Sequence, residues 1–95
     1  MNNHYQPKTD LEKNLFLALS KLGKEQDAAD FLRDLLTPAE LTEFSHRLEI
    51  ARLLSTGKSY LDVAKQVGVS TTTVTRVAHW LNDGCGGYKR VLGIK

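Results

Sequence analysis

Two short helical patterns stand three residues apart between residues 58 and 82, and this spacing limits the folds open to the chain. Helices joined by so short a turn cross at roughly 90–120°. The crossing needs a small residue where the helices meet and a glycine in the turn, and Ala64 and Gly68 stand at these positions. The positions that should face inward are all occupied by valine. They are Val63, Val67, Val69, Val74 and Val77. The segment therefore predicts a helix-turn-helix.

Helix-start signals divide the remaining chain into further helices. Thr9 with Glu12 and Thr37 with Glu40 have the spacing of capping boxes, and Pro38 fits the first turn of the helix that follows Thr37. Further caps are expected at Ser59, with Asp62, and at Ser70.

The expected helices have short breaks between them, and no stretch alternates as a strand would. They cover about residues 10–22, 25–36, 38–54, 60–66 and 71–82, and residues 88–94 form a last turn or short helix. Gly23 and Gly57 are expected just past two of the helix ends. The fold class is all-α, with five or six helices.

The helix expected from residue 38 to residue 54 is apolar on more than one side, so it should be central to the core. Its apolar residues are Leu41, Phe44, Leu48, Ile50, Ala51, Leu53 and Leu54.

A chain of 95 residues makes a single domain, with 41% hydrophobic and 25% charged residues as in soluble globular proteins. We expect residues 1–8 to be mobile, residues 9–57 to form dimerisation helices, residues 58–82 the helix-turn-helix and residues 83–95 a C-terminal tail. Neither a signal-peptide hydrophobic region nor an apolar run long enough for a membrane span is visible, so a cytoplasmic protein is expected.

Charge is unevenly distributed along the chain. Residues 1–45 carry five Lys/Arg and eight Asp/Glu, a net −3, whereas residues 46–95 carry eight and three, a net +5. The second half therefore has the charge expected of a face that meets anions, although a solvated surface without such a role would also fit.

Other chemistries find little support in the sequence. His4, His46, His79 and Cys85 lack metal-ligand spacing, so no metal is expected. Cys85 is the only cysteine and lies between glycines, which leaves redox sensing through an intermolecular disulfide as a minor alternative. Paired carboxylates, a nucleophile elbow and a phosphate loop are all lacking, and enzyme activity is not expected.

The threonines at the start of the second helix of the motif fit a reading surface for DNA. Such residues meet base edges in the major groove, and Thr71, Thr72 and Thr75 lie on the face opposite Val74 and Val77. The predicted DNA-binding residues are Lys58, Ser59, Lys65, Ser70, Thr71, Thr72, Thr75, Arg76 and His79. A surface helix that merely begins with hydroxyl residues is the alternative.

Three stretches between about residues 31 and 82 are similar to motifs of one known family: "LLTPAE", "HRLEIARLLSTG" and "VGVSTTTVTR". On these stretches the chain resembles the bacterial Trp repressor family, and within it the YerC/YecD group of Trp-repressor-like helix-turn-helix proteins. The resemblance implies an intertwined homodimer of all-α chains, with two reading heads on a pseudo-palindromic site of double-stranded DNA.

The resemblance also implies an effector pocket, in which L-tryptophan would lie between Arg47 and Arg76. Leu36, Thr37 and Thr73 match further pocket positions, whereas Val77 stands where the family has glycine and Trp80 where it has serine. Both changes fill space, so L-tryptophan is not expected to bind in the repressor's mode. We expect Trp80, with or without Val77, to occupy the ligand's place; packing of Trp80 at the core or dimer surface is the alternative.

The two arginines of this pocket also have simpler interpretations. Arg76 could contact phosphate, and Arg47 could pair with Glu43 one turn earlier in the same helix.

The predicted function is sequence-specific DNA binding by a dimeric transcriptional regulator that acts as a repressor and needs no cofactor. Two alternatives stay open: a helix-turn-helix protein-interaction module without operator binding, and a regulator that uses a different small-molecule effector. The small net charge of +2 keeps the first of these open, since many DNA-binding proteins are more basic.

Overall fold

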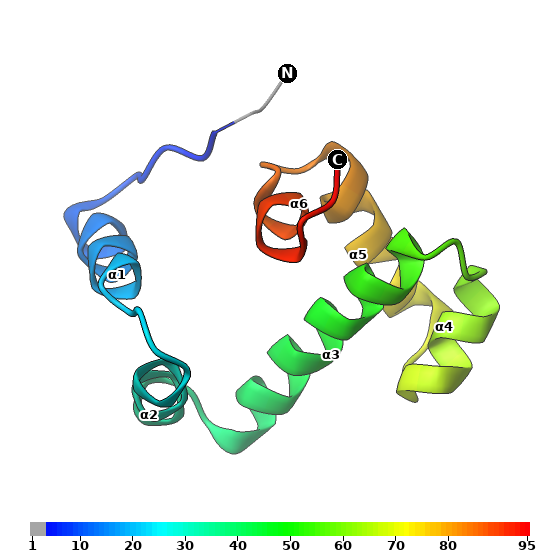
Figure 1. Cartoon of the computed structure of the whole chain (residues 1–95), viewed down its shortest axis with the longest axis horizontal. Coiled ribbons are helices and arrows are strands. Elements are labelled where there is room, and N and C mark those ends of the chain that lie inside the picture. The colour runs from blue at the N-terminus through cyan, green and yellow to red at the C-terminus, as the bar shows by residue number, and fades with distance from the viewer. Residues whose placement is uncertain (1–3) are drawn as a thin grey trace. The chain divides into compact units, whose positions relative to one another are not determined.

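The computed structural model describes residues 4–95, and within them it contains six helices and no strand (Figure 1). The helices are α1 (Asp10–Ser20), α2 (Glu25–Leu35), α3 (Pro38–Ser55), α4 (Tyr60–Val67), α5 (Thr71–Asp83) and α6 (Gly87–Leu92). The predicted all-α class is confirmed. The chain divides into two compact units, one of residues Tyr5–Thr42 and the other mainly of Glu43–Lys95. No helix within residues 4–95 is both long and apolar enough to cross a membrane.

The start of α1 is fixed by hydrogen bonds to the residues before it. Thr9 is the N-cap, and its hydroxyl accepts from the Glu12 N–H at 3.1 Å. The Glu12 carboxylate accepts from the Lys8 N–H at 3.3 Å and from the Tyr5 hydroxyl at 2.6 Å. The predicted cap at Thr9 is therefore confirmed. The second bond of a capping box would join the Glu12 carboxylate to the Thr9 N–H, but this carboxylate accepts from the Lys8 N–H instead.

The sequence predicts that the segment before α1 is mobile over residues 1–8. Its first three residues lie outside the described part of the chain. In the rest, Tyr5 packs edge-on against the Phe16 ring, with 5.9 Å between ring centroids, so this residue contacts α1 by both its ring and its hydroxyl.

The end of α1 differs from the expectation that Gly23 lies just past it. The helix ends at Ser20, and Lys21 stays in the right-handed conformation with its N–H donating to the Ala18 carbonyl at 3.2 Å. The Ser20 hydroxyl also donates to the Leu17 carbonyl at 2.7 Å. Because the last turn tightens and satisfies its own carbonyls, a left-handed glycine is not needed there.

The capping box predicted before α3 is complete. The Thr37 N–H donates to the Glu40 carboxylate at 3.0 Å, and the Glu40 N–H donates to the Thr37 hydroxyl at 3.2 Å. The bond from the Thr37 backbone holds the pKa of Glu40 below its usual value, because it stabilises the charged form. At the other end, Gly57 has φ +92° and its N–H donates to the Leu54 carbonyl at 3.1 Å, as predicted for a helix end.

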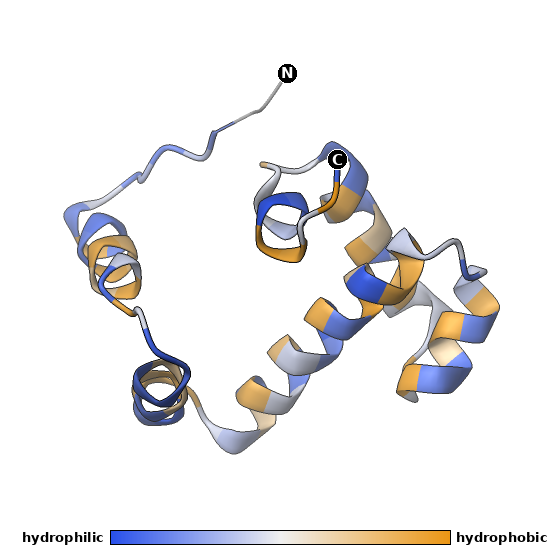
Figure 2. Ribbon diagram, viewed as in Figure 1, coloured by the Kyte–Doolittle hydropathy of each residue, from blue (hydrophilic) through white to orange (hydrophobic). Residues whose placement is uncertain are grey.

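The second half of α3 lies in the core of the unit Glu43–Lys95, which confirms its expected central place there. Ile50 and Ala51 are 0% exposed and Leu53 is 2% exposed. Earlier in the helix, Phe44 and Leu48 remain 45% and 42% exposed. Figure 2 shows apolar and polar segments following one another along the visible side of α3.

The two helices of the motif cross at the end of α3, as Figure 1 shows, and their contact surface is made of valines. Val63, Val74 and Val77 are 0% exposed, and Val67 and Val69 are partly buried against the same cluster. All five predicted inward positions are therefore confirmed.

The turn between α4 and α5 depends on glycine. Gly68 has φ +83° and ψ +40°, a left-handed conformation that costs other residues conformational energy. Its N–H and that of Val69 both donate to the Ala64 carbonyl, at 2.9 and 3.0 Å. The turn therefore closes directly on the small residue at the helix crossing.

Helix α6 packs against α5 and adds Tyr88 and Leu92 to the edge of the core. Between the two helices, the Gly84 N–H donates to the Trp80 carbonyl at 3.1 Å. A Cβ atom at Gly84 would collide with that carbonyl oxygen, so glycine is required at the end of α5.

We predict that Gly68→Ala lowers the free energy of unfolding by about 1–2 kcal/mol, because alanine is strained at this φ. Space is not the reason, since a Cβ there meets no atom within 4 Å. Gly23→Ala is the matched control: its Cβ is equally unobstructed and its φ is not in the left-handed region. Urea unfolding followed by circular dichroism compares the two, and equal losses of stability would contradict the argument.

Candidate nucleic-acid interface

Helix α5 has one buried face and one exposed face, with opposite chemistry. The buried face consists of Val74, Val77, Ala78 and Leu81. The exposed side chains at the start and along the other face are Thr71, Thr72, Thr75, Arg76 and His79. Five of the nine predicted DNA-binding residues thus share one solvent-facing surface.

The N-terminus of α5 carries no compensating negative charge. Helices α1 to α4 each have an acidic residue in the first turn, whereas the first turn of α5 has none. Its cap is the neutral Ser70, whose hydroxyl accepts from the Thr73 N–H at 3.2 Å and lies 3.1 Å from the Thr73 hydroxyl. The partial positive charge of this helix end therefore remains available to an anion.

The residues predicted to contact the DNA backbone before α5 belong to α4 and its N-terminal flank, and they are exposed. Ser59 caps α4 by accepting from the Asp62 N–H at 3.2 Å, which leaves its own proton available to a phosphate oxygen. Lys58 precedes this cap and Lys65 lies in the last turn of α4.

Two residues farther along α5 differ in their partners. His79 Nδ1 lies 3.5 Å from the Asp83 carboxylate one turn later, with both side chains about 70% exposed (70% and 69%). Arg76 is exposed on the same helix, and within residues 4–95 the structure gives its guanidinium no ion pair. Of these two side chains, Arg76 is therefore the one without a neighbouring carboxylate partner.

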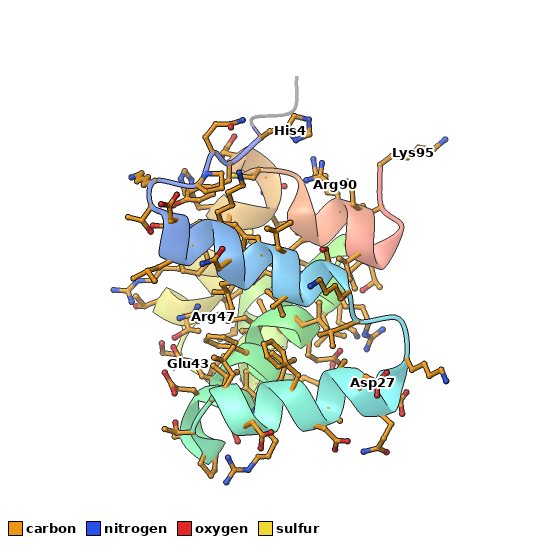
Figure 3. The ribbon with its side chains drawn as sticks, turned by 90° about the vertical axis from the view of Figure 1, so that its left-hand side faces the viewer. His4, Asp27, Glu43, Arg47, Arg90 and Lys95 are labelled. Carbon is orange, nitrogen blue, oxygen red and sulfur yellow. The ribbon has the colours of Figure 1, made fainter. Side chains whose placement is uncertain are left out.

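Arg47, one of the two arginines implied for an effector pocket, is already engaged. Its Nη2 lies 2.7 Å from the Glu43 carboxylate, and Figure 3 shows these two side chains next to each other on α3. Its guanidinium also lies 5.3 Å from the Trp80 ring centroid and 5.5 Å from that of Phe44. The pairing with Glu43 considered from the sequence is present, and cation–π contacts with two rings add to it.

The other residues of the implied pocket lie in different surroundings. Val77 is fully buried in the core and Thr73 lies partly buried in the first turn of α5. Leu36 and Thr37 belong to the unit Tyr5–Thr42, where the Leu36 carbonyl accepts from Arg33 at 3.0 Å. Of the implied set, the structure therefore brings Arg47 and Trp80 together.

The structure adds an apolar groove that the sequence did not indicate. The groove has a volume of about 510 Å³. It is lined by Leu48, Trp80, Gly84, Cys85, Gly87, Tyr88 and Val91. Burial raises the pKa of the Tyr88 hydroxyl, and the nearby charge of Arg47 partly offsets this. The residues that line the groove come from α3 and from the C-terminal helices. Local sequence patterns do not reveal that these segments lie together.

The residues considered for metal or redox chemistry do not form a cluster. Within residues 4–95 there is no group of three His, Cys, Asp or Glu side chains that could hold a metal ion. Cys85 is an exposed free thiol.

Comparisons with known proteins agree with the fold and the motif. The profile of the Trp repressor protein family matches residues 11–94. The YerC protein of Bacillus subtilis (strain 168) is 35% identical over 78 residues, which are 82% of this chain and 75% of that protein.

Two crystal structures are similar to this chain over most of its length. One is of a TrpR-like protein from Eubacterium eligens ATCC 27750, with a TM-score of 0.84, 40% identity and coverage of 90% of this chain and 89% of that one. The other, from Staphylococcus aureus, has a TM-score of 0.83 and 29% identity, covering 90% and 86%. The resemblance inferred from the sequence motifs is thus confirmed.

We predict that L-tryptophan gives no stoichiometric binding heat when it is titrated at micromolar concentration into the protein in a calorimeter. The reason is that the Arg47 guanidinium is paired with Glu43 and covered by the Trp80 ring. Trp80→Ser, which restores the family's residue at this position, serves as the comparison. A stoichiometric heat with the unmodified protein would contradict the prediction.

Proposed function

The chain belongs to the Trp repressor family, and from this membership we propose that it is a transcriptional regulator that binds a specific site on double-stranded DNA as a homodimer. In this proposal α5 is the recognition helix, and the protein acts as a repressor. The proposal needs neither a cofactor nor free L-tryptophan.

The observation that carries the proposal is the exposed start of α5. Thr71, Thr72 and Thr75 present hydroxyl and methyl groups, which suit base edges in the major groove. They are held by the rigid valine core on the other side of the helix, so their positions are set by the fold. The uncompensated helix end favours the approach of phosphate.

Phosphate contacts would come from the flanks of this surface. Lys58, Lys65 and Arg76 supply exposed cations, and Ser59 and Ser70 supply hydroxyl groups at the two helix starts. His79 adds a further cation when it is protonated. Such contacts position a protein on DNA, while contacts to base edges specify the sequence.

A homodimer accounts for the apolar surface that one chain leaves exposed. Leu11 and Val91 are 80% and 77% exposed, and Phe44, Leu48 and Trp80 are all more than 40% exposed. So many large apolar side chains facing solvent are typical of an interaction surface. An intertwined dimer of the kind the family implies would cover them and place two reading heads about one DNA turn apart.

Trp80 has a regulatory consequence within this proposal. Its ring lies against the Arg47 guanidinium. It would therefore occupy the place beside this arginine that the ring of a bound aromatic effector would otherwise occupy. The reading head would then be held ready for DNA without an effector. The alternative, that Trp80 packs in a dimer interface, is compatible with its 42% exposure in the single chain.

A protein-interaction module is the second candidate, and the apolar groove beside Trp80 favours it. Selection of bound fragments from genomic DNA separates the two functions. Recovery of no preferred sequence at low salt would favour the interaction module.

We predict that affinity for the selected DNA falls steeply with salt concentration, because phosphate contacts release counterions. Lys65→Ala should weaken binding to all sequences alike and reduce the salt slope by about 1. Thr72→Ala should instead lower the preference for the selected site by about 0.5–1.5 kcal/mol and leave nonspecific affinity unchanged. Gel shifts at several salt concentrations measure the salt slope and the preference for the selected site. Identical behaviour of the two variants would contradict a phosphate contact by Lys65 and a base contact by Thr72.

We predict that Leu11→Glu weakens dimerisation by about 1.5–3 kcal/mol, the value of burying a leucine side chain. Because Leu11 is 80% exposed in the single chain, the same change should leave the helix content unaffected. Lys13→Glu, which places a carboxylate on the opposite face of α1, is the control. Sedimentation equilibrium measures the association, and an unchanged dimer in the Leu11 variant would argue against a role of α1 in the interface.

A further inference from the structure

Thr75 differs from the other two threonines of the exposed α5 surface in its hydrogen bonding. Its hydroxyl donates to the Thr71 carbonyl one turn earlier, at 2.9 Å. Within residues 4–95 the structure gives the Thr71 and Thr72 hydroxyls no such partner. Of these three threonines, only Thr75 therefore has a hydroxyl proton that is already engaged in a hydrogen bond.

The local geometry explains why this bond forms. A threonine side chain inside a helix has few allowed rotamers, and one of them brings its oxygen next to the carbonyl one turn earlier. A hydroxyl group has one proton and two lone pairs, so a hydroxyl whose proton is committed can only accept from a further partner. The bond to the Thr71 carbonyl of the same helix therefore makes the Thr75 hydroxyl a hydrogen-bond acceptor toward a ligand.

We infer that Thr75 reads a base by accepting a hydrogen bond from an exocyclic amino group in the major groove, the N6 group of adenine or the N4 group of cytosine. This inference rests on the proposed DNA-binding function. The acceptors guanine O6, guanine N7 and thymine O4 would face the lone pairs of the hydroxyl and be disfavoured. Thr71 and Thr72, with uncommitted protons, can serve either kind of base edge.

The position of Thr75 suits this role. It lies on the exposed face one turn after Thr71, while Val74 next to it is 0% exposed and anchors the helix in the core. The side chain is thus at the surface on a backbone that the core holds in place. A single hydroxyl at such a site can contribute to discrimination only if its hydrogen-bond direction is defined, and the bond to Thr71 defines it.

The test combines a side-chain change with the removal of single amino groups from the DNA. Thr75→Val keeps the shape and a methyl group but removes the acceptor, and Thr75→Ser keeps the hydroxyl. In the selected site, purine replaces each adenine and 2-pyrimidinone replaces each cytosine, one at a time, which deletes one amino group. Thr42→Val removes a hydroxyl from an exposed position of α3 and is the control.

The expected result is a coupling between one residue and one base. Thr75→Val should bind the selected site about 5- to 10-fold more weakly, in the range of a single lost hydrogen bond. At one base of each half-site, deletion of the amino group should weaken the unmodified protein and Thr75→Ser to a similar extent and leave Thr75→Val unaffected. Thr42→Val should behave as the unmodified protein at every base.

Three outcomes would overturn the inference, and they differ in what else they affect. Unchanged binding by Thr75→Val would assign any contact to the methyl group. Equal weakening of the unmodified protein and Thr75→Val at every amino-group deletion would mean that the Thr75 hydroxyl accepts from none of these amino groups. Both of these leave the proposed function intact. Failure of the unmodified protein to select any DNA sequence would instead remove the proposed function, and the inference with it.

Discussion

The valine contact between α4 and α5 is the interaction on which the exposed surface of the motif depends. Val63, Val74 and Val77 are completely buried, together with Ile50 of α3, so the two short helices are held by one another and by α3. Helices of 8 and 13 residues would be marginal in isolation. Their stability therefore comes mainly from this packing, which also fixes the direction of every side chain on the opposite face of α5.

The same packing explains how much of the fold could be predicted from the sequence. Caps at Thr37, Ser59 and Ser70 are local chemistry between residues three positions apart, and the structure has all three. The valine register could be predicted because the crossing of two adjacent helices allows few arrangements. Gly23 was misinterpreted because the signal for a left-handed end is only statistical, and α1 closes by a tight turn instead.

The contacts of Arg47 show which interactions can be predicted from the sequence and which cannot. Its ion pair with Glu43 joins neighbours on one helix and could be considered from spacing alone. Its contact with Trp80 joins residues far apart in the chain, and the groove beside Trp80 also needs Tyr88 and Val91 from α6. Such contacts follow from how helices pack, and periodicity within one helix holds no information about them.

The start of α5 has a thermodynamic consequence for the chain as a whole. An acidic residue in the first turn usually stabilises a helix by about 0.3–1 kcal/mol, and α1 to α4 each have at least one. Helix α5 forgoes this contribution, so its sequence is not the most stable one for its own fold. Substitution of Thr71, Thr72 or Thr73 by an acidic residue would make the domain more robust and at the same time repel any polyanion. Under the proposed DNA-binding function, stability and recognition make opposite demands at this helix end, and the neutral first turn of α5 is what recognition of a polyanion would favour.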